Sequence, residues 1–129
     1  MSPEIPRQEP LLDDESRSKL PELYTGEKSG LGENALALVK FFLPGGGWTW
    51  YASEGSPVDE DGYYDTDKPK VDYIFFGLVV GLEIELGYFS LSELEEVRGS
   101  FGLPVERDLY FQPKSLKELE ELHKRGEVG

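Results

Sequence analysis

Cysteine is absent from this 129-residue chain, and histidine occurs only at position 123. Without cysteine the chain can form no disulfide, no thiolate nucleophile and no cysteine-ligated zinc site. A Ser-His-Asp hydrolase would have to use His123, and the sequence has no Gly-x-Ser-x-Gly nucleophile elbow. We predict that His123 is a solvated residue in the last turn of a terminal helix, where the helix dipole favours a cation. The sequence therefore predicts no catalytic residue.

Basic residues are scarce, since 13 Lys and Arg face 26 Asp and Glu, which gives a formal charge of −13. Affinity for a phosphate backbone comes from Lys and Arg that displace counterions, so we expect no direct binding of nucleic acid. Long hydrophobic runs are missing too, and none approaches the roughly 20 residues that span a bilayer. No signal-peptide pattern opens the chain, so we expect a cytoplasmic protein without membrane attachment.

Heat-labile residues are rare, with a single methionine, a single asparagine and two glutamines. Glutamate is abundant, and this combination favours a thermophilic source. Hydrophobic residues make up 38% of the chain, which is enough for the core of one domain.

The chain divides into a lead-in and a core. Three prolines in residues 1–10 predict a flexible lead-in, followed by a single globular domain over residues 11–129. Within this domain, seven acidic residues and two lysines predict a long acidic loop at residues 54–72.

Apolar and alternating runs predict strands, and capping patterns predict helices. The predicted strands are 35–43, 48–53, 73–80 and 105–111, with 82–90 left open between a tight hairpin and a loop. The predicted helices are about 13–23, one opened by Ser92-x-x-Glu95, and one running from Ser115-x-x-Glu118 to Gly126. Because the strands follow one another as hairpins without βαβ alternation, we predict an α+β fold. It is a single antiparallel sheet of four to five strands with two to three short helices packed on it.

Carboxylates in the acidic loop are the ligands that hard cations prefer. However, Gly62 lies at the fourth position of a loop that begins at Asp59, whereas an EF-hand has glycine at the sixth. Glu83 and Glu85 share one face of an extended segment, as expected for the wet face of a strand. We therefore predict no metal site and no cofactor.

Six motifs occur in a fixed order between residues 17 and 120. They are Lys19-Leu-Pro-Glu-Leu-Tyr24, Val39-Lys-Phe-Phe42, Trp48-Thr-Trp-Tyr51, Phe75-Phe-Gly-Leu-Val79, Glu85-Leu-Gly-Tyr-Phe-Ser-Leu-Ser-Glu-Leu94 and Gly102-Leu-Pro-Val-Glu-Arg-Asp-Leu-Tyr-Phe111. This string resembles a small bacterial family known as a domain of unknown function and found on plasmids, integrative elements and phages. The resemblance implies an accessory gene of mobile DNA that acts in the bacterial cytoplasm, and it implies no reaction.

Aromatic residues near acidic groups are typical of protein interfaces, because each buries a large area and Tyr or Trp keeps a polar atom. We expect Trp48 and Trp50 in the core, and Tyr51, Tyr63 and Tyr64 exposed. Arg98 and Glu106-Arg107-Asp108 are charged residues among apolar neighbours. They form either a structural salt-bridge network or a recognition patch. The candidate interaction residues are Tyr51, Glu54, Asp59, Glu60, Asp61, Tyr63, Tyr64, Arg98 and Arg107.

Three functions remain open at this point. The one we favour is a non-enzymatic regulator that binds a host protein, with RNA polymerase or an associated factor as the partner to test first. The acidic surface would be attracted to the basic channels of such a machine. The alternatives are a DNA mimic that blocks a DNA-binding enzyme, and a metal-assisted hydrolase.

Overall fold

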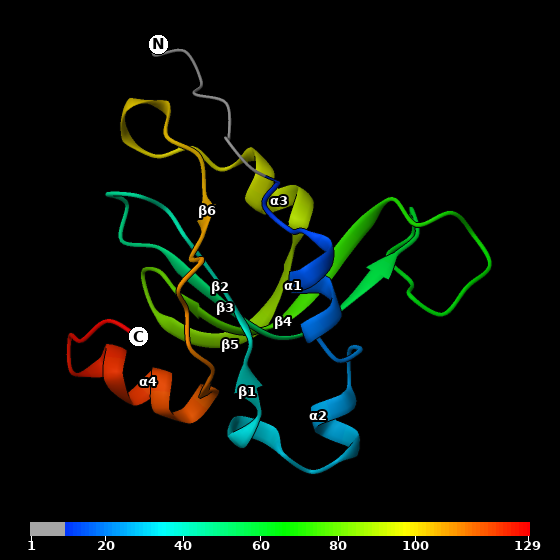
Figure 1. Cartoon of the computed structure of the whole chain (residues 1–129), viewed down its shortest axis with the longest axis horizontal. Helices are drawn as coiled ribbons and strands as arrows, with labels where there is room; N and C mark the ends of the chain where they lie inside the picture. The colour runs from blue at the N-terminus through cyan, green and yellow to red at the C-terminus, as the bar shows by residue number, and fades with distance from the viewer. Residues whose placement is uncertain (1–9) are drawn as a thin grey trace.

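Five antiparallel strands form the central sheet of the computed structural model, which describes residues 10–129 (Figure 1). Their spatial order is β5-β4-β3-β2-β6. The strands are β2 (Val39–Phe42), β3 (Thr49–Val58), β4 (Asp72–Val80), β5 (Ile84–Ser90) and β6 (Glu106–Arg107). A separate two-stranded ladder pairs β1 (Leu36–Ala37) with β7 (Lys114–Ser115). The fold is therefore α+β as predicted, with a second small ladder that the prediction of a single sheet did not include.

Four short α-helices accompany the strands. They are α1 (Asp14–Lys19), α2 (Thr25–Lys28), α3 (Leu91–Glu96) and α4 (Leu116–Lys124). Two 3-10 turns, Gly32–Asn34 and Ser100–Gly102, complete the elements. Across residues 10–129, none of the helices has the length and apolar character needed to cross a bilayer. Of the expected lead-in at residues 1–10, only Pro10 lies within the described part of the chain.

The hairpins follow the predicted turn signals. β2 and β3 pair across the glycine turn at residues 44–47, where Gly45 and Gly47 have positive φ. β4 and β5 pair from Val80 opposite Ile84 to Ile74 opposite Ser90, so residues 82–90 form the tight hairpin and not the loop.

Several predicted element boundaries are wrong. The predicted helix at about 13–23 ends at Lys19, because Leu20 before Pro21 is extended. The predicted strand 35–43 is divided between two sheets, because β1 pairs with β7 while β2 pairs with β3. The predicted strand 105–111 is reduced to β6, because the chain turns at Asp108, whose carboxylate accepts the N–H of Tyr110. Helix α3 is capped by Ser90, whose hydroxyl accepts the N–H of Glu93, since Ser92 is hydrogen-bonded to Asp72.

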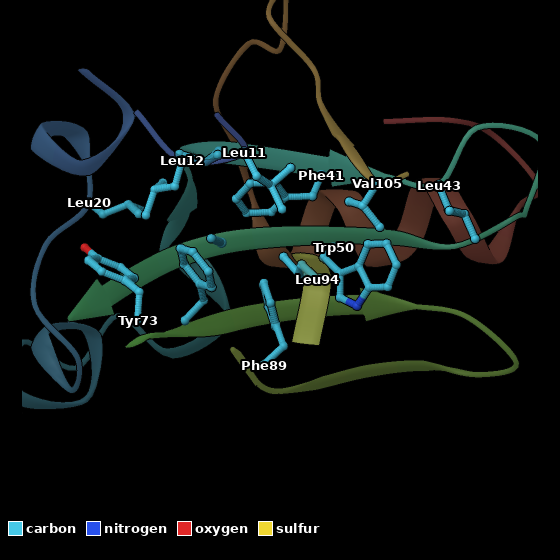
Figure 2. Close-up of a cluster of buried hydrophobic side chains, with 13 residues drawn as sticks. Leu11, Leu12, Leu20, Phe41, Leu43, Trp50, Tyr73, Phe89, Leu94 and Val105 are labelled. Carbon is cyan, nitrogen blue, oxygen red and sulfur yellow. The ribbon is translucent and has the colours of Figure 1, made fainter. Parts of the chain in front are cut away.

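Apolar side chains cover both faces of the sheet. One cluster joins the N-terminal segment and α3 to the sheet, and Figure 2 shows it with Leu11, Phe41 and Leu94 among its members. The other cluster packs α4 on the opposite face through Leu116 and Leu119. Strand β4 is apolar on both faces because it lies between the two clusters.

Strand β3 is longer than predicted, because its pairing with β4 continues beyond a β-bulge. Its register against β4 shifts between Ala52 and Glu54, so Ala52 lies opposite Gly77 while Glu54 lies opposite Phe76. Pairing then continues to Val58, and residues 54–58 belong to the sheet and not to the acidic loop. An extra residue in one strand bends it and re-aims the side chains beyond the bulge.

Next to the bulge, the backbone of β3 lies very close to Gly77 of β4. A Cβ at this position would lie 1.7 Å from the carbonyl oxygen of Tyr51, which is part of the neighbouring strand and cannot move aside. Glycine at such a position lets two strands approach without a side chain between them.

We predict that Gly77→Ala lowers the free energy of unfolding by at least about 2 kcal/mol, since overpacking against backbone costs this much or more. Gly87→Ala is the matched control, because Gly87 lies directly opposite Gly77 in β5 and a Cβ there meets nothing within 4 Å. Urea denaturation of both variants measures the difference, and equal stabilities would contradict the close approach.

Candidate functional site

Glu54 is buried at the bulge, with 5% of its surface exposed. One carboxylate oxygen accepts the N–H of Tyr24 at 2.9 Å, and the other accepts the N–H of Gly26. Both donors belong to the segment around α2, which is 28 to 30 residues away in sequence. A Cβ on Gly26 would lie 3.0 Å from the carboxylate, so glycine allows this close contact. A carboxylate with two backbone donors satisfies the rule that buried charge must be hydrogen-bonded.

The segment before α2 is also tied to the end of β3. Gly55 donates its N–H to the carbonyl of Pro21 at 2.9 Å, and Leu23 donates its N–H to the Ser56 hydroxyl at 3.0 Å. Tyr24 has a φ of 71°, a left-handed conformation that is uncommon for residues other than glycine. The contacts with β3 hold Tyr24 in this conformation, which brings its ring over the sheet.

Four aromatic rings meet beside this anchor. The ring of Tyr24 lies 6.0 Å from that of Tyr64 and 6.3 Å from that of Tyr88, between centroids. Tyr88 in turn lies 5.0 Å from Phe76, its cross-strand partner in β4. Tyr24 and Tyr88 are 37% and 56% exposed, so their rings form part of the surface. We call Tyr24, Tyr64, Phe76 and Tyr88 the aromatic cluster.

A cavity of about 250 Å³ opens between the aromatic cluster and the Glu54 anchor. Its walls include Tyr24, Phe76 and Tyr88, together with the exposed acidic residues Glu27 and Glu33. Partial burial raises the pKa of the Tyr88 phenol, and the neighbouring Tyr24 and Glu27 raise it further. The Tyr24 phenol contributes through its own ionisation and a hydrogen bond, and the carboxylates of Glu27 and Glu54 contribute through their negative charge. The rings offer apolar contact and the carboxylates accept hydrogen bonds, so this cavity is suited to binding a ligand.

Three predicted interaction residues are buried. Tyr51 has no exposed surface, so the expectation that it is exposed is wrong, because its side chain lies on the face of the sheet that α4 covers. Glu54 is buried at the anchor, and Asp59 is 2% exposed. Trp50 is buried as expected, while Trp48 stacks on it and remains 36% exposed.

The acidic loop, residues 59–71 in the structure, is organised by Asp59. Its carboxylate accepts the hydroxyl of Thr66 at 2.6 Å and the N–H groups of Asp61 and Tyr63. The Thr66 hydrogen bond is the main cause that lowers the pKa of Asp59. Asp61 pairs with Lys68 at 2.7 Å. Figure 1 shows this loop extending away from the rest of the molecule.

The remaining predicted candidates lie at separate places. Within the loop, Glu60 and Tyr63 are exposed, whereas Tyr64 joins the aromatic cluster through Tyr24.

Across the described residues, 10–129, no group of three or more His, Asp or Glu side chains could hold a metal ion.

The two candidate arginines make internal contacts. Arg107 donates to the carbonyls of Pro10 and Leu11 and to the carboxylate of Asp13 at 3.0 Å, so it fastens the N-terminal segment beside β6. Arg98 donates to the carbonyls of Glu95 and Val97 at the end of α3.

A second polar cluster lies beneath α4, and His123 belongs to it. The Tyr51 hydroxyl and the Nε2 of His123 are 2.6 Å apart. Burial raises the pKa of Tyr51 to about 12, and burial together with the Lys40 ammonium lowers the pKa of His123. Both groups are therefore neutral near pH 7, and one hydrogen bond joins the Tyr51 hydroxyl to Nε2, with its direction set by the His123 tautomer. The expectation of a solvated His123 is wrong, because α4 packs it against Tyr51.

Sequence reasoning missed Tyr24, Tyr88, Glu27 and Glu33 as site residues. The alternation of residues 84–90 carries a signal for Tyr88, because a tight hairpin sets it opposite Phe76. Nothing in the sequence indicates the left-handed backbone of Tyr24, which depends on contacts with β3 about 30 residues away.

We predict that Glu54→Gln lowers the free energy of unfolding by about 1–3 kcal/mol, because an amide has one acceptor where the carboxylate has two. One of the two N–H donors, from Tyr24 or Gly26, then loses its partner. Amide hydrogen exchange at these two residues measures the local effect, and urea denaturation the global one. The matched control is Glu96→Gln on the exposed face of α3; an equally small effect of both substitutions would contradict the anchor.

We predict that neutral His123 makes stability depend on pH. Its pKa in the folded protein lies below the unfolded value of 6.5, so the unfolded chain binds the proton first. This contribution to stability is present above pH 6.5 and is lost as the pH falls through the folded pKa. Between about pH 7 and pH 5, the wild type should lose more stability than His123→Gln, which does not titrate. Thermal unfolding at several pH values measures both slopes, and parallel slopes would contradict the assignment.

Comparison with known proteins gives one match. Residues 11–125 match the family described as "Protein of unknown function (DUF2958)". No curated protein and no solved structure matches the chain. The matched range runs from the N-terminal segment through every helix and strand of the fold, and therefore includes the Glu54 anchor and the aromatic cluster. The chain belongs to the DUF2958 family of proteins of unknown function.

Proposed function

We propose that this protein is a non-enzymatic regulator that binds a basic surface of a host protein. The partner is part of a nucleic-acid machine in the bacterial cytoplasm, and RNA polymerase or a polymerase-bound factor is the first to test. The protein binds no nucleic acid directly, because its net charge of −13 repels a phosphate backbone.

The observation that carries this proposal is the aromatic cluster beside exposed carboxylates. Tyrosines are enriched at the energetic centres of protein interfaces, because they bury a large area and keep a hydroxyl for hydrogen bonding. Tyr24 and Tyr88 are partly exposed and meet a cavity flanked by Glu27 and Glu33. Negative charge around such a cluster accelerates the approach of a basic partner and disfavours acidic ones.

The setting of this activity comes from the resemblance noted above. The resemblance implies an accessory protein of mobile DNA, and we propose that such a protein acts on host machinery. We extend this to the present chain, and we infer a thermophilic source from its scarcity of heat-labile residues.

Mimicry of DNA is the second candidate, and it requires a continuous row of unpaired carboxylates. In the described residues several carboxylates are paired with neighbouring cations, as in Lys68–Asp61, Lys124–Glu120 and Arg125–Glu127. These pairs interrupt the negative surface, so we rank mimicry below protein binding. The hydrolase alternative is ranked last, because the Asp59 carboxylate already accepts three internal hydrogen bonds.

The test is binding of the tagged protein to purified bacterial RNA polymerase, core and holoenzyme, at low and moderate salt. We expect a stoichiometric complex that weakens with salt, and a loss of at least about tenfold in affinity for Tyr88→Ala, as for a residue at an interface centre. Tyr110→Ala is the matched control, since Tyr110 is 87% exposed and lies outside the aromatic cluster.

Two outcomes would contradict the proposal. If neither form of the polymerase binds, the assignment of the partner is wrong. If a pull-down from bacterial lysate also recovers no stoichiometric partner at either salt concentration, the binding function itself is wrong. Displacement of the protein by duplex DNA from a DNA-binding enzyme would favour mimicry instead.

A further inference from the structure

We propose that the cavity between the Glu54 anchor and the aromatic cluster binds a single arginine side chain of a protein partner. This inference deepens the proposed function, and it rests on that function for the source of the arginine. The ligand chemistry, a planar cation on an apolar stem, follows from the walls of the cavity.

The size of the cavity fits one side chain. Its volume is about 250 Å³, which is smaller than the roughly 300–1,000 Å³ of pockets that enclose drug-sized molecules. Ala35 and Leu86 add apolar surface to the wall, which suits the methylene stem of a long side chain.

The rings of the wall fit a cation. Tyr24, Phe76 and Tyr88 all line the cavity, and their centroids lie 5.0 Å (Phe76–Tyr88) and 6.3 Å (Tyr24–Tyr88) apart. The rings of Phe76 and Tyr88 are inclined by 58°, and those of Tyr24 and Tyr88 by 52°. A cation within about 6 Å of a ring centroid is attracted by the negative face of the ring. Rings tilted toward one another can present faces to the same small volume.

The carboxylates make the cavity selective for positive charge. Glu27 and Glu33 line it, and within residues 10–129 neither forms an ion pair. Glu54 also lines the cavity, but both of its carboxylate oxygens already accept backbone N–H groups. Glu54 therefore adds to the negative potential of the wall without offering a free acceptor. Glu27 and Glu33 can accept hydrogen bonds from a ligand, and Glu33 also interacts at longer range with the Lys124 ammonium.

Arginine fits these walls better than lysine or a neutral residue. The guanidinium is planar, stacks on aromatic rings and is more weakly hydrated than an ammonium, so it loses less on entering an apolar cavity. Its five N–H donors match carboxylates that lie at the side of the stacked group. A neutral side chain of the same shape would leave the negative potential of the cavity uncompensated.

The direct test uses acetyl-arginine amide as the probe and the acetyl-citrulline amide, its neutral counterpart of nearly the same shape, as the control. Binding is followed by nuclear magnetic resonance of tyrosine and tryptophan ring signals in the full chain. We expect saturable shifts of Tyr24 and Tyr88 with the arginine probe, with a dissociation constant on the order of 1 mM. The citrulline probe should produce no saturable shift.

Variants assign the site. Tyr88→Leu keeps apolar bulk but removes the ring, and should weaken the arginine probe about fivefold or more. The double substitution Glu27→Gln and Glu33→Gln should weaken it at least about threefold and reduce its dependence on salt. The matched controls, Tyr110→Leu and Glu96→Gln, lie outside the cavity and should bind the probe as the wild type does.

Three results would overturn the inference: no saturable shift at Tyr24 and Tyr88, equal binding of both probes, or loss of binding in the controls. Shifts confined to Trp48 would also overturn it, since Trp48 lines a separate cavity with Glu83 and Glu85. The titration needs no partner protein, so its failure is distinct from failure of the proposed function. A polymerase complex that survives Tyr88→Leu alongside a negative titration would leave protein binding standing and this cavity without a role.

Discussion

The carboxylate of Glu54 connects two parts of the chain that are distant in sequence, strand β3 and the segment around α2. A strand without a bulge would alternate strictly, and Glu54 would lie on the face opposite to Ser53, toward the cluster that contains Phe41 and Phe75. The shifted register places Glu54 opposite Phe76 instead, on the face where α2 lies. There its two oxygens meet the N–H groups of Tyr24 and Gly26. A buried carboxylate left without donors would cost several kcal/mol, so the segment around α2 must dock for the bulge to be stable. The bulge and the docked segment therefore depend on each other.

This mutual dependence also explains how the four rings of the aromatic cluster come together. Tyr88 and Phe76 are brought together by ordinary strand pairing, which follows from the hairpin between β4 and β5. Tyr24 reaches them only because its backbone N–H is held by Glu54 in a left-handed conformation. The ring of Tyr64 is added from the acidic loop, which Asp59 folds by accepting three hydrogen bonds. The aromatic cluster thus combines rings from three separate segments. A hydrogen-bonded acidic residue positions Tyr24 and Tyr64, and the register of the sheet positions Phe76 and Tyr88.

The sequence predicts those parts of the fold whose causes are local. The glycine turn before Trp48, the two-sided apolar strand that became β4, and the capping of α4 by Ser115 all depend on residues within a few positions of one another. The bulge, the burial of Tyr51 and the hydrogen bond between Tyr51 and His123 depend on residues 22 or more positions apart, and no local pattern encodes them. For the site, the sequence indicates Tyr64 by its residue type and Glu54 by its charge. It places Glu54 in a solvated loop, because hydrophobic alternation does not reveal a bulge.

Buried polar groups in this fold are of two kinds, and the difference locates the site. Lys40 lies 3.5 Å from the Asp108 carboxylate and donates to the carbonyl of Gly129, and the Tyr51 hydroxyl is bonded to His123. These groups satisfy one another's hydrogen bonds and charges beneath α4. Such satisfied networks stabilise one packing of the core but offer no contact to a ligand. Glu54 is equally satisfied, yet its surroundings include a cavity, partly exposed rings and carboxylates that form no ion pair within the described residues. A charge that is fixed by backbone donors cannot turn away or be neutralised by a mobile side chain, so its potential persists in the cavity whether or not a ligand is bound. Preorganised potential of this kind lowers the cost of binding a cation, because the protein does not have to reorganise when the cation arrives.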